Sequence, residues 1–332
     1  MTIRVGVVGV GGMGACHARH IAELAGAELA WVGDPDEGNG RHLAAELDTT
    51  WVADASTMLD EADALVIACP DRFHHRFAVA ALERGLPALC EKPLTVELDD
   101  AREIVDAEVA LGRRLLQLGF MRVYDERHRQ VAEAAAPFGT VHHIRAVHRN
   151  TNDGSRSVGQ MLVESVIHDI HTVRWLAGAE IEQVSASTVV HDDATRMLVV
   201  TCRLAGGGLA TLEFDDMATG YEVSVEVTAE RGNVVAAEPL RAAVRSAGVV
   251  AGEIGDDWFS PFLETYRVEM QDFLASIEAG VARGPSAWDG YAAQAVVAAA
   301  TESARVGGAV DVELAPKPAL YASTTERAGV SQ

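Results

Sequence analysis

The chain has 332 residues, of which 48% are hydrophobic and 23% are charged, a composition typical of a soluble globular protein of about two domains. Its formal net charge is −22, from 49 acidic and 27 basic residues. Nucleic acids and anionic membranes bind surfaces rich in lysine and arginine, so we expect neither as a partner. An anionic cofactor is compatible with this charge because backbone N–H groups can bind it locally.

The cysteines predict a reducing environment. They contain no CxxC pair, and three of them lie in strand-like runs, so we expect buried, reduced thiols at Cys16, Cys69, Cys90 and Cys202. The chain shows no secretory leader pattern and no run of about 18 apolar residues that would span a membrane. These features predict a cytoplasmic protein.

A glycine-rich turn follows the first apolar run, Ile3–Val8, and reads Gly9-Val10-Gly11-Gly12-Met13-Gly14. The first glycine of such a turn permits a tight strand-to-helix connection, and the second lets the backbone approach a pyrophosphate. The third allows close packing of helix and strand, while the helix N-terminus faces the anion. A helical pattern over 13–24 follows, so this stretch predicts a dinucleotide site.

Asp34 ends the second strand-like run, 20 residues after Gly14. A carboxylate here can accept hydrogen bonds from the adenosine ribose and would repel a 2′-phosphate. The next five residues are acidic or neutral, and the first arginine is Arg41. We therefore predict NAD rather than NADP; a turn or capping role for Asp34 before Pro35 is compatible with this.

Short apolar strands alternate with helices as far as about residue 121. Strands are predicted near 3–9, 28–33, 64–69, 87–91 and 115–119, and helices near 13–24, 40–47, 73–85 and 98–111. This alternation indicates a doubly wound parallel sheet, whose ligands bind beyond the carboxyl ends of the strands. The residues at those ends are Gly9, Asp34, Pro70 and Glu91-Lys92-Pro93.

The pattern changes after Arg122. A helix near 126–135 is followed by a strand near 139–149, a polar loop over 150–159 and a helix at 161–177. Strands near 181–191, 195–204, 208–216 and 221–229 then indicate a large, mainly antiparallel sheet, and alanine-rich helices at 263–280 and 288–305 close that domain.

The predicted fold is α/β, with two domains and a tail. A Rossmann domain over 1–121 binds NAD, an α+β domain over 122–316 binds substrate and mediates oligomerisation, and a flexible tail covers 317–332. Along the strand at 221–229, Tyr221 and three valines point one way and polar residues the other. A sheet face left without cover often pairs with another subunit, so we expect a homo-oligomer, a dimer or tetramer formed through this face.

A cluster of acidic and imidazole side chains lies on the helix predicted at 161–177. Glu164 and His168 are i,i+4 neighbours, and His171 follows on the same face. A carboxylate beside an imidazole can keep it a usable base, although a polar helix edge with a satisfied histidine explains the pattern equally well. The HExxH spacing is absent and no fourth ligand is evident, so we predict no metal.

Lys92 follows the apolar strand that ends at Cys90. Burial and a positively charged nicotinamide ring would lower the pKa of this lysine toward a value useful for catalysis. A single lysine in a loop is more often simply solvated, and its place at the ligand edge of the sheet is what distinguishes this one.

Taken together, these residues resemble the glucose–fructose oxidoreductase / inositol 2-dehydrogenase (Gfo/Idh/MocA) family over roughly residues 3 to 314. The matching segments are the glycine turn, Ala68–His74, Cys90-Glu91-Lys92-Pro93-Leu94, Gly119-Phe120-Met121-Arg122, the helix with Glu164 and His168, the strand from Gly220 to Val227, and Asp289-Gly290-Tyr291. The His168 helix, Arg122 and Gly220-Tyr221 resemble the inositol dehydrogenase branch.

The resemblance implies a role for each matching residue. Lys92 would contact the reacting hydroxyl and assist its deprotonation, and His168 would be the general acid/base. Glu164 would orient His168 or hold a neighbouring hydroxyl. Arg122, Tyr221, Asn150 and His171 would line the substrate pocket. The cofactor would contact Gly9, Gly11, Gly12, Met13, Gly14, Asp34, Pro70, His74, Glu91 and Lys92.

Two positions depart from the family pattern, because inositol dehydrogenases usually have aspartate where Glu164 and His171 stand. The predicted function is NAD-dependent oxidation of a cyclitol or sugar hydroxyl. Alternatives are an aldose, an aminocyclitol, or an anionic or nucleotide sugar paired with Arg122, Arg149 or Arg156. A noncatalytic NAD-binding regulatory protein is the alternative from another class.

Overall fold

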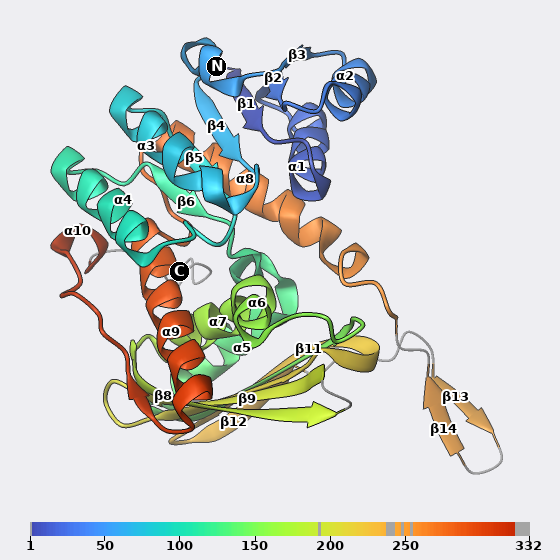
Figure 1. Ribbon diagram of the computed structural model, residues 1–332, viewed down its shortest axis with the longest axis vertical. Coiled ribbons are helices and arrows are strands. Elements are labelled where there is room, and N and C mark those ends of the chain that lie inside the picture. Colours follow the sequence, from blue (N-terminus) through green and yellow to red (C-terminus); the bar gives the residue numbers. More distant parts are fainter. Residues whose placement is uncertain (1, 192–193, 237–242, 247–248, 253–254, 323–332) are drawn as a thin grey trace. The chain divides into compact units, whose positions relative to one another are not determined.

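The computed structural model describes residues 2–191, 194–236, 243–246, 249–252 and 255–322 (Figure 1). Contacts divide the chain into two compact units. Among the described residues, unit 1 comprises 2–124, 264–292 and 315–322, and unit 2 comprises those within 125–263 and 293–314.

Unit 1 is built on a parallel sheet with the strand order β3-β2-β1-β4-β5-β6, which confirms the predicted doubly wound sheet. Every strand predicted in this region is present, and one short strand, β3, was not predicted. Its three residues are too few to give a recognisable pattern. The strands are β1 (Ile3–Val8), β2 (Ala27–Gly33), β3 (Thr50–Val52), β4 (Ala64–Ile67), β5 (Ala88–Cys90) and β6 (Leu116–Leu118).

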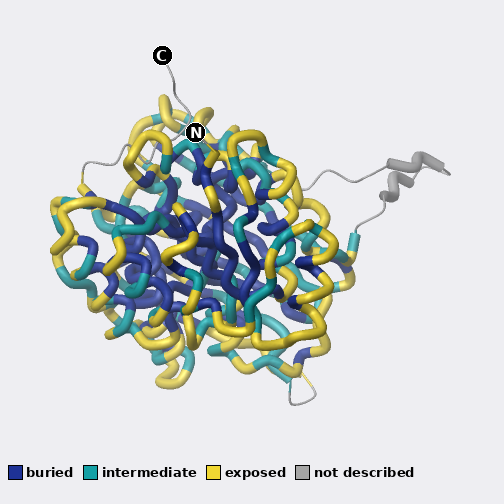
Figure 2. The backbone as a smooth tube through the Cα atoms, turned by 90° about the horizontal axis from the view of Figure 1, so that it is seen from above, coloured by how far each residue is buried: buried dark blue, intermediate teal, exposed yellow. Residues whose placement is uncertain are grey.

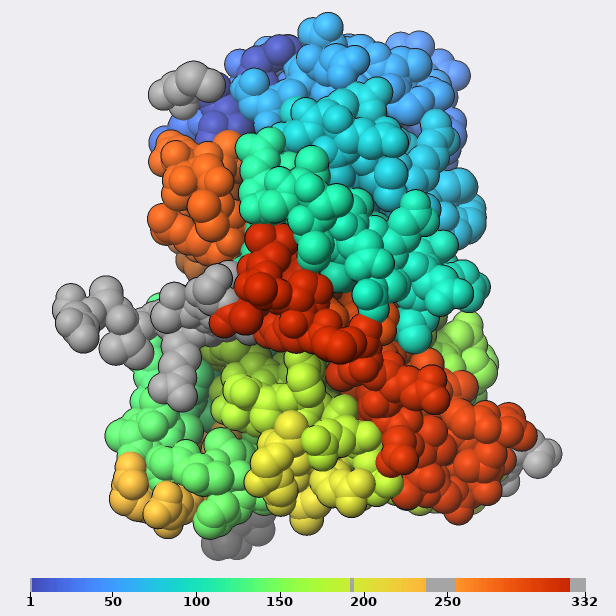
Figure 3. Space-filling model, turned by 90° about the vertical axis from the view of Figure 1, so that its left-hand side faces the viewer, coloured from blue at the N-terminus to red at the C-terminus, as the bar shows by residue number. Residues whose placement is uncertain are grey.

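The helices of unit 1 begin and end where their local sequence dictates. Asp36 caps α2 by accepting a hydrogen bond from the N–H of Asn39 at 2.9 Å. Two helices end at a left-handed glycine, Gly85 with φ 66° and Gly112 with φ 68°. These helices are α1 (Gly12–Glu23), α2 (Glu37–Glu46), α3 (His74–Arg84) and α4 (Leu98–Leu111). Helices α3 and α4 contact each other and form the light-blue to teal surface of Figure 3.

Helix α8 (Leu263–Ala279) belongs almost entirely to unit 1, although we predicted it in the second domain. Met270, Phe273 and Leu274 are buried in one core cluster with residues of β1 and β2. The amphipathic pattern of α8 predicts a helix with an apolar face but does not say which sheet that face covers. Helix α9 (Ala287–Val306) contributes its first residues to unit 1 and the rest to unit 2.

The segment after Pro316 is ordered near Tyr321, contrary to the predicted flexible tail. Residues Ala319–Ala322 form the short helix α10, and Tyr321 is buried. Its hydroxyl donates a hydrogen bond to Glu108 Oε2 at 2.8 Å, and the other oxygen of Glu108 accepts from the N–H groups of Leu115 and Leu116. Residues 323–332 of the predicted tail lie outside the described residues.

Unit 2 contains a sheet with the order β12-β11-β7-β10-β9-β8-β15, in which only β10 and β7 are parallel. This confirms the predicted large, mainly antiparallel sheet. Strands β13 (Ala243–Ser246) and β14 (Val249–Gly252) form a separate hairpin. The sheet strands are β7 (Val141–Thr151), β8 (Ile181–His191), β9 (Ala194–Leu204), β10 (Leu209–Asp215), β11 (Met217–Ala229), β12 (Gly232–Ala236) and β15 (Val310–Asp311).

Burial alternates along the strands of unit 2. Figure 2 shows the buried residues of the chain in dark blue and the exposed ones in yellow. In β11 the three valines Val223, Val225 and Val227, which were predicted to point to one face, are buried within the chain, while their polar neighbours are partly exposed. Helices α5 (Glu126–Ala135), α6 (Val158–Met161) and α7 (Ile167–Ala177) lie on one side of the sheet (Figure 1). The partly exposed side chains include a cross-strand ion pair between Arg145 and Glu213.

No helix within the described ranges has both the length and the apolar character needed to cross a bilayer.

Candidate functional site

The glycine turn of unit 1 combines two closely packed glycines with two open ones. Gly9 has φ +90°, and a Cβ there would lie 2.6 Å from the backbone of Cys69. A Cβ on Gly14 would collide with the carbonyl oxygen of Gly9. In contrast, a Cβ on Gly11 or Gly12 would meet no described atom within 4 Å. The turn is therefore tightly packed at Gly9 and Gly14 and open at Gly11 and Gly12, where a pyrophosphate needs to approach the backbone.

Helix α1 begins directly at this open space. No described side chain caps its N-terminus at Gly11, and its first turn carries no acidic residue. The first N–H groups of a helix lack partners within the helix, and the helix dipole adds partial positive charge there. The residues present therefore fit the diphosphate of a dinucleotide, as the glycine pattern predicts.

Asp34 lies at the end of β2 beside the glycine turn. Its Oδ2 accepts a hydrogen bond from the N–H of Val10, and its Oδ1 accepts one from the N–H of Asp36, each at 2.8 Å. The indole of Trp51 donates to the carbonyl oxygen of Asp34 at 3.0 Å. The carboxylate is thus held in place as a turn residue, at the position suited to binding ribose hydroxyls.

Glu91 forms a buried pair with His17, a residue that the sequence analysis did not identify. His17 Nε2 lies 2.8 Å from Glu91 Oε1, and Glu91 Oε2 accepts from the N–H of Lys92 at 3.2 Å. Burial alone would raise the pKa of Glu91, but the hydrogen bond and charge of His17, with the charge of Lys92, leave that pKa below its usual value. His17 follows Gly14 by three residues and precedes Ile21 by four, a spacing that places it on the buried face of α1.

His74 connects the ends of two neighbouring strands of the sheet. Its Nδ1 lies 2.7 Å from the carbonyl oxygen of Pro93, and its Nε2 lies 2.8 Å from that of Cys69. The imidazole is buried, whereas Pro70 is exposed. His74 therefore fixes the loop that carries Lys92, which is itself partly buried.

A second buried carboxyl group, Glu269 on α8, was also not predicted. Neither of its side-chain oxygens has a hydrogen-bond partner among the described residues. Burial, with the charges of Glu91 and Asp272, raises the pKa of Glu269 well above its usual value. Asp272 accepts a hydrogen bond from the hydroxyl of Tyr124 at 3.0 Å. A carboxyl group buried in this way favours the protonated form.

The predicted substrate residues are distributed over both units. Arg122 is buried in the short 3₁₀ helix Met121–Tyr124 of unit 1. The other five belong to unit 2, and they are Asn150, Glu164, His168, His171 and Tyr221. Asn150 lies at the end of β7 rather than in a loop, and its amide donates to the hydroxyl of Ser165 at 3.1 Å.

The helix that carries Glu164 and His168 is not continuous α-helix. A π-helical segment, Leu162–Val166, separates α6 from α7. Glu164 lies within the π turn and His168 lies after it, so the regular i,i+4 geometry that we assumed does not apply to this pair. Single π turns occur frequently at functional sites because they change the direction of side chains within a helix.

Arg156 contacts Glu164 from the loop that precedes α6. Its NH1 donates to Glu164 Oε2 at 3.2 Å, and its guanidinium also pairs with the buried Asp216. Arg149 likewise pairs with Glu222. Two of the three arginines that could have bound an anionic substrate are therefore occupied by carboxylates.

His168 is partly buried and His171 is buried on α7. Asp169, which lies between them in the sequence, contacts His148, with Asp169 Oδ2 and His148 Nδ1 3.0 Å apart. The ring of His148 lies edge-on to that of Tyr221, with centroids 6.0 Å apart. Tyr221 lies where the register between β11 and β7 shifts, an irregularity that can redirect a side chain toward a site. His148 and Asp169 were not identified from the sequence.

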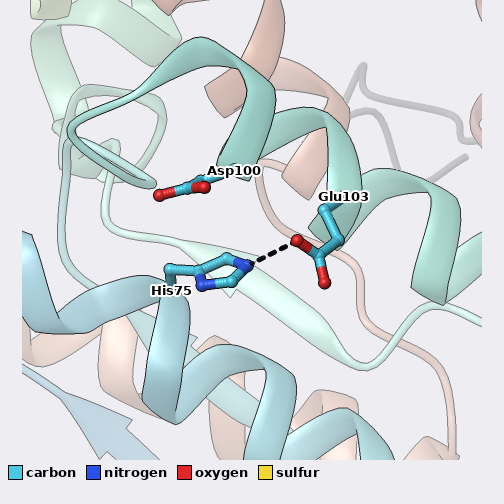
Figure 4. A group of neighbouring side chains, drawn as sticks. All are labelled: His75, Asp100 and Glu103. Carbon is cyan, nitrogen blue, oxygen red and sulfur yellow. Dashed lines mark hydrogen bonds and ion pairs between the residues drawn. The ribbon is translucent and has the colours of Figure 1, made fainter.

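One group in the described part of the chain has ligand atoms close enough to hold a metal ion: His75 on α3 with Asp100 and Glu103 on α4 (Figure 4). These atoms lie within 4.8 Å of one another. The imidazole of His75 already pairs with Glu103 at 3.2 Å, and Asp100 lies in the first turn of α4, where the helix dipole opposes a cation. We assign no role to this group.

Two family models match the chain. A model described as an oxidoreductase family with an NAD-binding Rossmann fold matches residues 3–120, and the C-terminal alpha/beta domain of the same oxidoreductase family matches residues 138–313. Together they cover most of both predicted domains.

Full-length relatives and solved structures are also similar to the chain. Inositol 2-dehydrogenase 1 of Saccharopolyspora erythraea is 39% identical over 97% of this chain and 99% of that protein. Inositol 2-dehydrogenase of Rubrobacter xylanophilus is 36% identical and covers 98% of each. The crystal structure of myo-inositol dehydrogenase from Lactobacillus casei, in complex with NAD(H) and myo-inositol, has a TM-score of 0.91 at 28% identity, covering 97% of this chain and 100% of that chain.

Proposed function

The chain belongs to the Gfo/Idh/MocA oxidoreductase family, and from that premise we propose that it oxidises a secondary hydroxyl of a cyclitol to a ketone with NAD as the cofactor. The full-length similarity to inositol 2-dehydrogenases carries the proposal. The open glycine turn and the oriented carboxylate of Asp34 support NAD as the cofactor. Aldoses and aminocyclitols are the next candidates because they present similar ring hydroxyls.

The proposed catalytic residues are Lys92, His168 and Glu164. Lys92 stabilises the reacting hydroxyl as it loses its proton, and His168 accepts that proton as general base. Glu164 binds a neighbouring hydroxyl of the ring. When bound, NAD supplies the hydride acceptor, and the protein contributes alignment and proton transfer.

The remaining site residues are proposed as binding groups. Arg122, Asn150, Tyr221 and His171 bind hydroxyl groups of the substrate. The cofactor contacts Gly9, Gly11, Gly12, Met13, Gly14, Asp34, Pro70, His74, Glu91 and Lys92. Residues 1–121 are proposed to serve NAD, and residues 122–316, apart from α8 and the first residues of α9, to serve substrate binding and assembly.

A neutral ring is favoured over an anionic or nucleotide sugar. Arg149 pairs with Glu222, and Arg156 pairs with Asp216 and Glu164. A guanidinium already bound to carboxylates would have to break those contacts before binding a substrate carboxylate or phosphate, which costs free energy.

We also propose that the protein is cytoplasmic and assembles as a dimer or tetramer. The four cysteines are free, and three of them are buried, as expected in a reducing compartment. The side of the unit 2 sheet opposite its described helices is the proposed contact surface.

The proposal is tested by measuring NADH formation with myo-inositol, scyllo-inositol, common aldoses and an aminocyclitol, using purified protein. Oxidation of at least one ring polyol with NAD, well above the rate with NADP, is expected. Folded protein that binds NAD but oxidises none of them would instead favour a noncatalytic NAD-binding role. Strong inhibition by simple carboxylates would favour an anionic substrate.

A further inference from the structure

Arg156 is the centre of a polar network in unit 2 that links a buried carboxylate to Glu164. The guanidinium Nε donates to Asp216 Oδ2 at 3.3 Å, and NH2 donates to Asp216 Oδ1. On its other side, NH1 lies 3.2 Å from both Glu164 Oε2 and Ser165 Oγ. One side chain therefore bridges the turn between β10 and β11 and the π-helical segment.

The buried carboxylate of Asp216 holds Arg156 in place. It is fully buried, and Asn152 donates to its Oδ1 at 2.8 Å. Only 16% of the Arg156 side chain is exposed, and its guanidinium carbon lies 5.6 Å from the ring centroid of Phe214. A planar guanidinium that pairs with a carboxylate through two N–H groups has little rotational freedom.

The Arg156–Asp216 pair orients Glu164. Its side chain is about half exposed (51%), and long exposed carboxylates normally sample several rotamers. The contact with Arg156 restricts that freedom, and the neighbouring Ser165 is held from both sides, by Arg156 and by the amide of Asn150. Both contacts fall within the π turn.

We propose that Arg156 is a positioning residue: it holds the carboxylate of Glu164 toward substrate and is itself unavailable to bind an anionic group. This inference rests on the proposed function. It also explains why this chain needs glutamate at 164, because aspartate is shorter by about one C–C bond length and would leave the 3.2 Å contact with Arg156 unmade.

The single variant Arg156→Gln would leave the carboxylate of Asp216 buried without a counter-charge and can impair folding. The test therefore uses the double variant Arg156→Gln/Asp216→Asn, which removes both charges together. The matched control is Arg196→Gln/Asp215→Asn, which removes a partly exposed ion pair of the same sheet with atoms 3.6 Å apart.

The experiment is a mutant cycle on kcat/KM for the best polyol substrate. Glu164→Gln alone is expected to lower kcat/KM by roughly 10²-fold, and the Arg156/Asp216 double variant by roughly tenfold, mainly through KM. The variant that combines all three changes should have a kcat/KM less than about threefold below that of Glu164→Gln alone, because the changes disturb one and the same contact. The Arg196/Asp215 control should stay within about twofold of wild type.

Losses that multiply in the combined variant would show that Arg156 acts independently of Glu164, and the inference would be overturned. The same follows if the Arg156/Asp216 variant matches wild type. Glu164→Asp provides a second check. Its kcat/KM should fall toward that of the Arg156/Asp216 variant. A kcat/KM equal to wild type would contradict the inference that only glutamate is long enough to contact Arg156.

A structural readout separates this inference from the proposed function. Crystal structures of wild type and the Arg156/Asp216 double variant should show one ordered Glu164 rotamer in the first and a displaced or disordered one in the second. An unchanged Glu164 would refute the positioning role even in an active enzyme. If the wild-type protein oxidised no polyol, the proposed function would be refuted. The comparison of Glu164 rotamers would still test whether Arg156 positions Glu164.

Discussion

His17 Nε2 on α1 and Glu91 Oε1 after β5 lie 2.8 Å apart, with the imidazole fully buried and the carboxylate nearly so. This contact joins the helix that follows the glycine turn to the residue that precedes Lys92. The dinucleotide-binding helix and the proposed catalytic lysine are therefore connected through one pair of side chains. A change at His17 or Glu91 is expected to affect both the helix α1 and the position of Lys92.

Replacing His17 with leucine should lower the free energy of unfolding by about 3 kcal/mol or more, because Glu91 would remain buried without its partner. Urea denaturation of the apo protein measures this. His42→Gln, which changes an exposed histidine of the same unit, should leave stability within about 0.5 kcal/mol of wild type. Equal effects of the two changes would contradict the buried-pair interpretation.

Glu91→Gln should destabilise the protein in a pH-dependent way. The folded pKa of Glu91 lies below its usual value, so its ionised form stabilises the native state. That stabilisation is present above the unfolded pKa, about 4.3, and is lost as the pH falls through the folded pKa. The stability difference between wild type and variant should therefore be largest near neutral pH and shrink in acid, as followed by urea denaturation across pH.

Glu269→Gln should have the opposite pH dependence. The folded pKa of Glu269 is raised by burial, so its contribution is complete below the unfolded pKa, about 4.3, and is lost as the pH rises toward the folded value. Relative to wild type, the variant should gain stability as the pH rises from 4 to 8. The control is Glu278→Gln on the same helix, an exposed position that should show no such trend. A pH-independent difference at Glu269 would argue against a raised pKa.

Two glycines of the same turn should respond differently to alanine. Gly14→Ala is expected to destabilise the fold by about 2 kcal/mol or more, because its Cβ would collide with the carbonyl oxygen of Gly9. Gly11→Ala should fold normally, since its Cβ meets no described atom within 4 Å, yet it should bind NAD at least about tenfold more weakly. Thermal denaturation and NAD titration distinguish the two. Normal NAD affinity in Gly11→Ala would place the pyrophosphate elsewhere.

Asp34→Ala should reduce the preference for NAD. The carboxylate beside the glycine turn would otherwise bind the ribose and repel a 2′-phosphate. The ratio of kcat/KM for NAD to that for NADP is expected to fall by about tenfold or more. Glu37→Gln, at an exposed residue of α2, serves as the control and should keep the wild-type ratio.

Lys92→Ala should lower turnover by around 10² or more while NAD binding persists. The amine is proposed to act on the substrate hydroxyl, whereas the cofactor is bound mainly through backbone N–H groups of the glycine turn. Steady-state kinetics and NAD titration measure the two properties separately. A parallel loss of both would make Lys92 a structural residue.

Local patterns in the sequence predicted most of the elements, and the proposed cofactor residues come from the same kind of pattern. The glycine turn, Asp34 and the strand ends depend on short-range chemistry, which a single sequence records directly. Strand β3 was missed because three residues carry too little periodicity. Helix α8 was recognised as a helix but was predicted in the second domain, since its amphipathic pattern does not show which sheet it packs against.

The side-chain contacts that were not predicted join distant parts of the chain. His17 and Glu91 are 74 positions apart, and Arg156 and Asp216 are 60 apart. The π turn changes the geometry between Glu164 and His168, and the apolar periodicity of this segment does not distinguish a π turn from α-helix. Arg156 was considered only as an anion-binding residue because its carboxylate partners could not be known.

The placement of α8 has a consequence for biosynthesis. Met270 and Phe273 fill the same core as Val5 and Leu29, so a nascent chain that has emerged only as far as residue 124 exposes an apolar surface on its first strands. Domains usually fold in the order of translation. Here the N-terminal segment cannot complete its core until α8, which ends at Ala279 of 332 residues, has been synthesised, and chaperone binding during that interval would protect it.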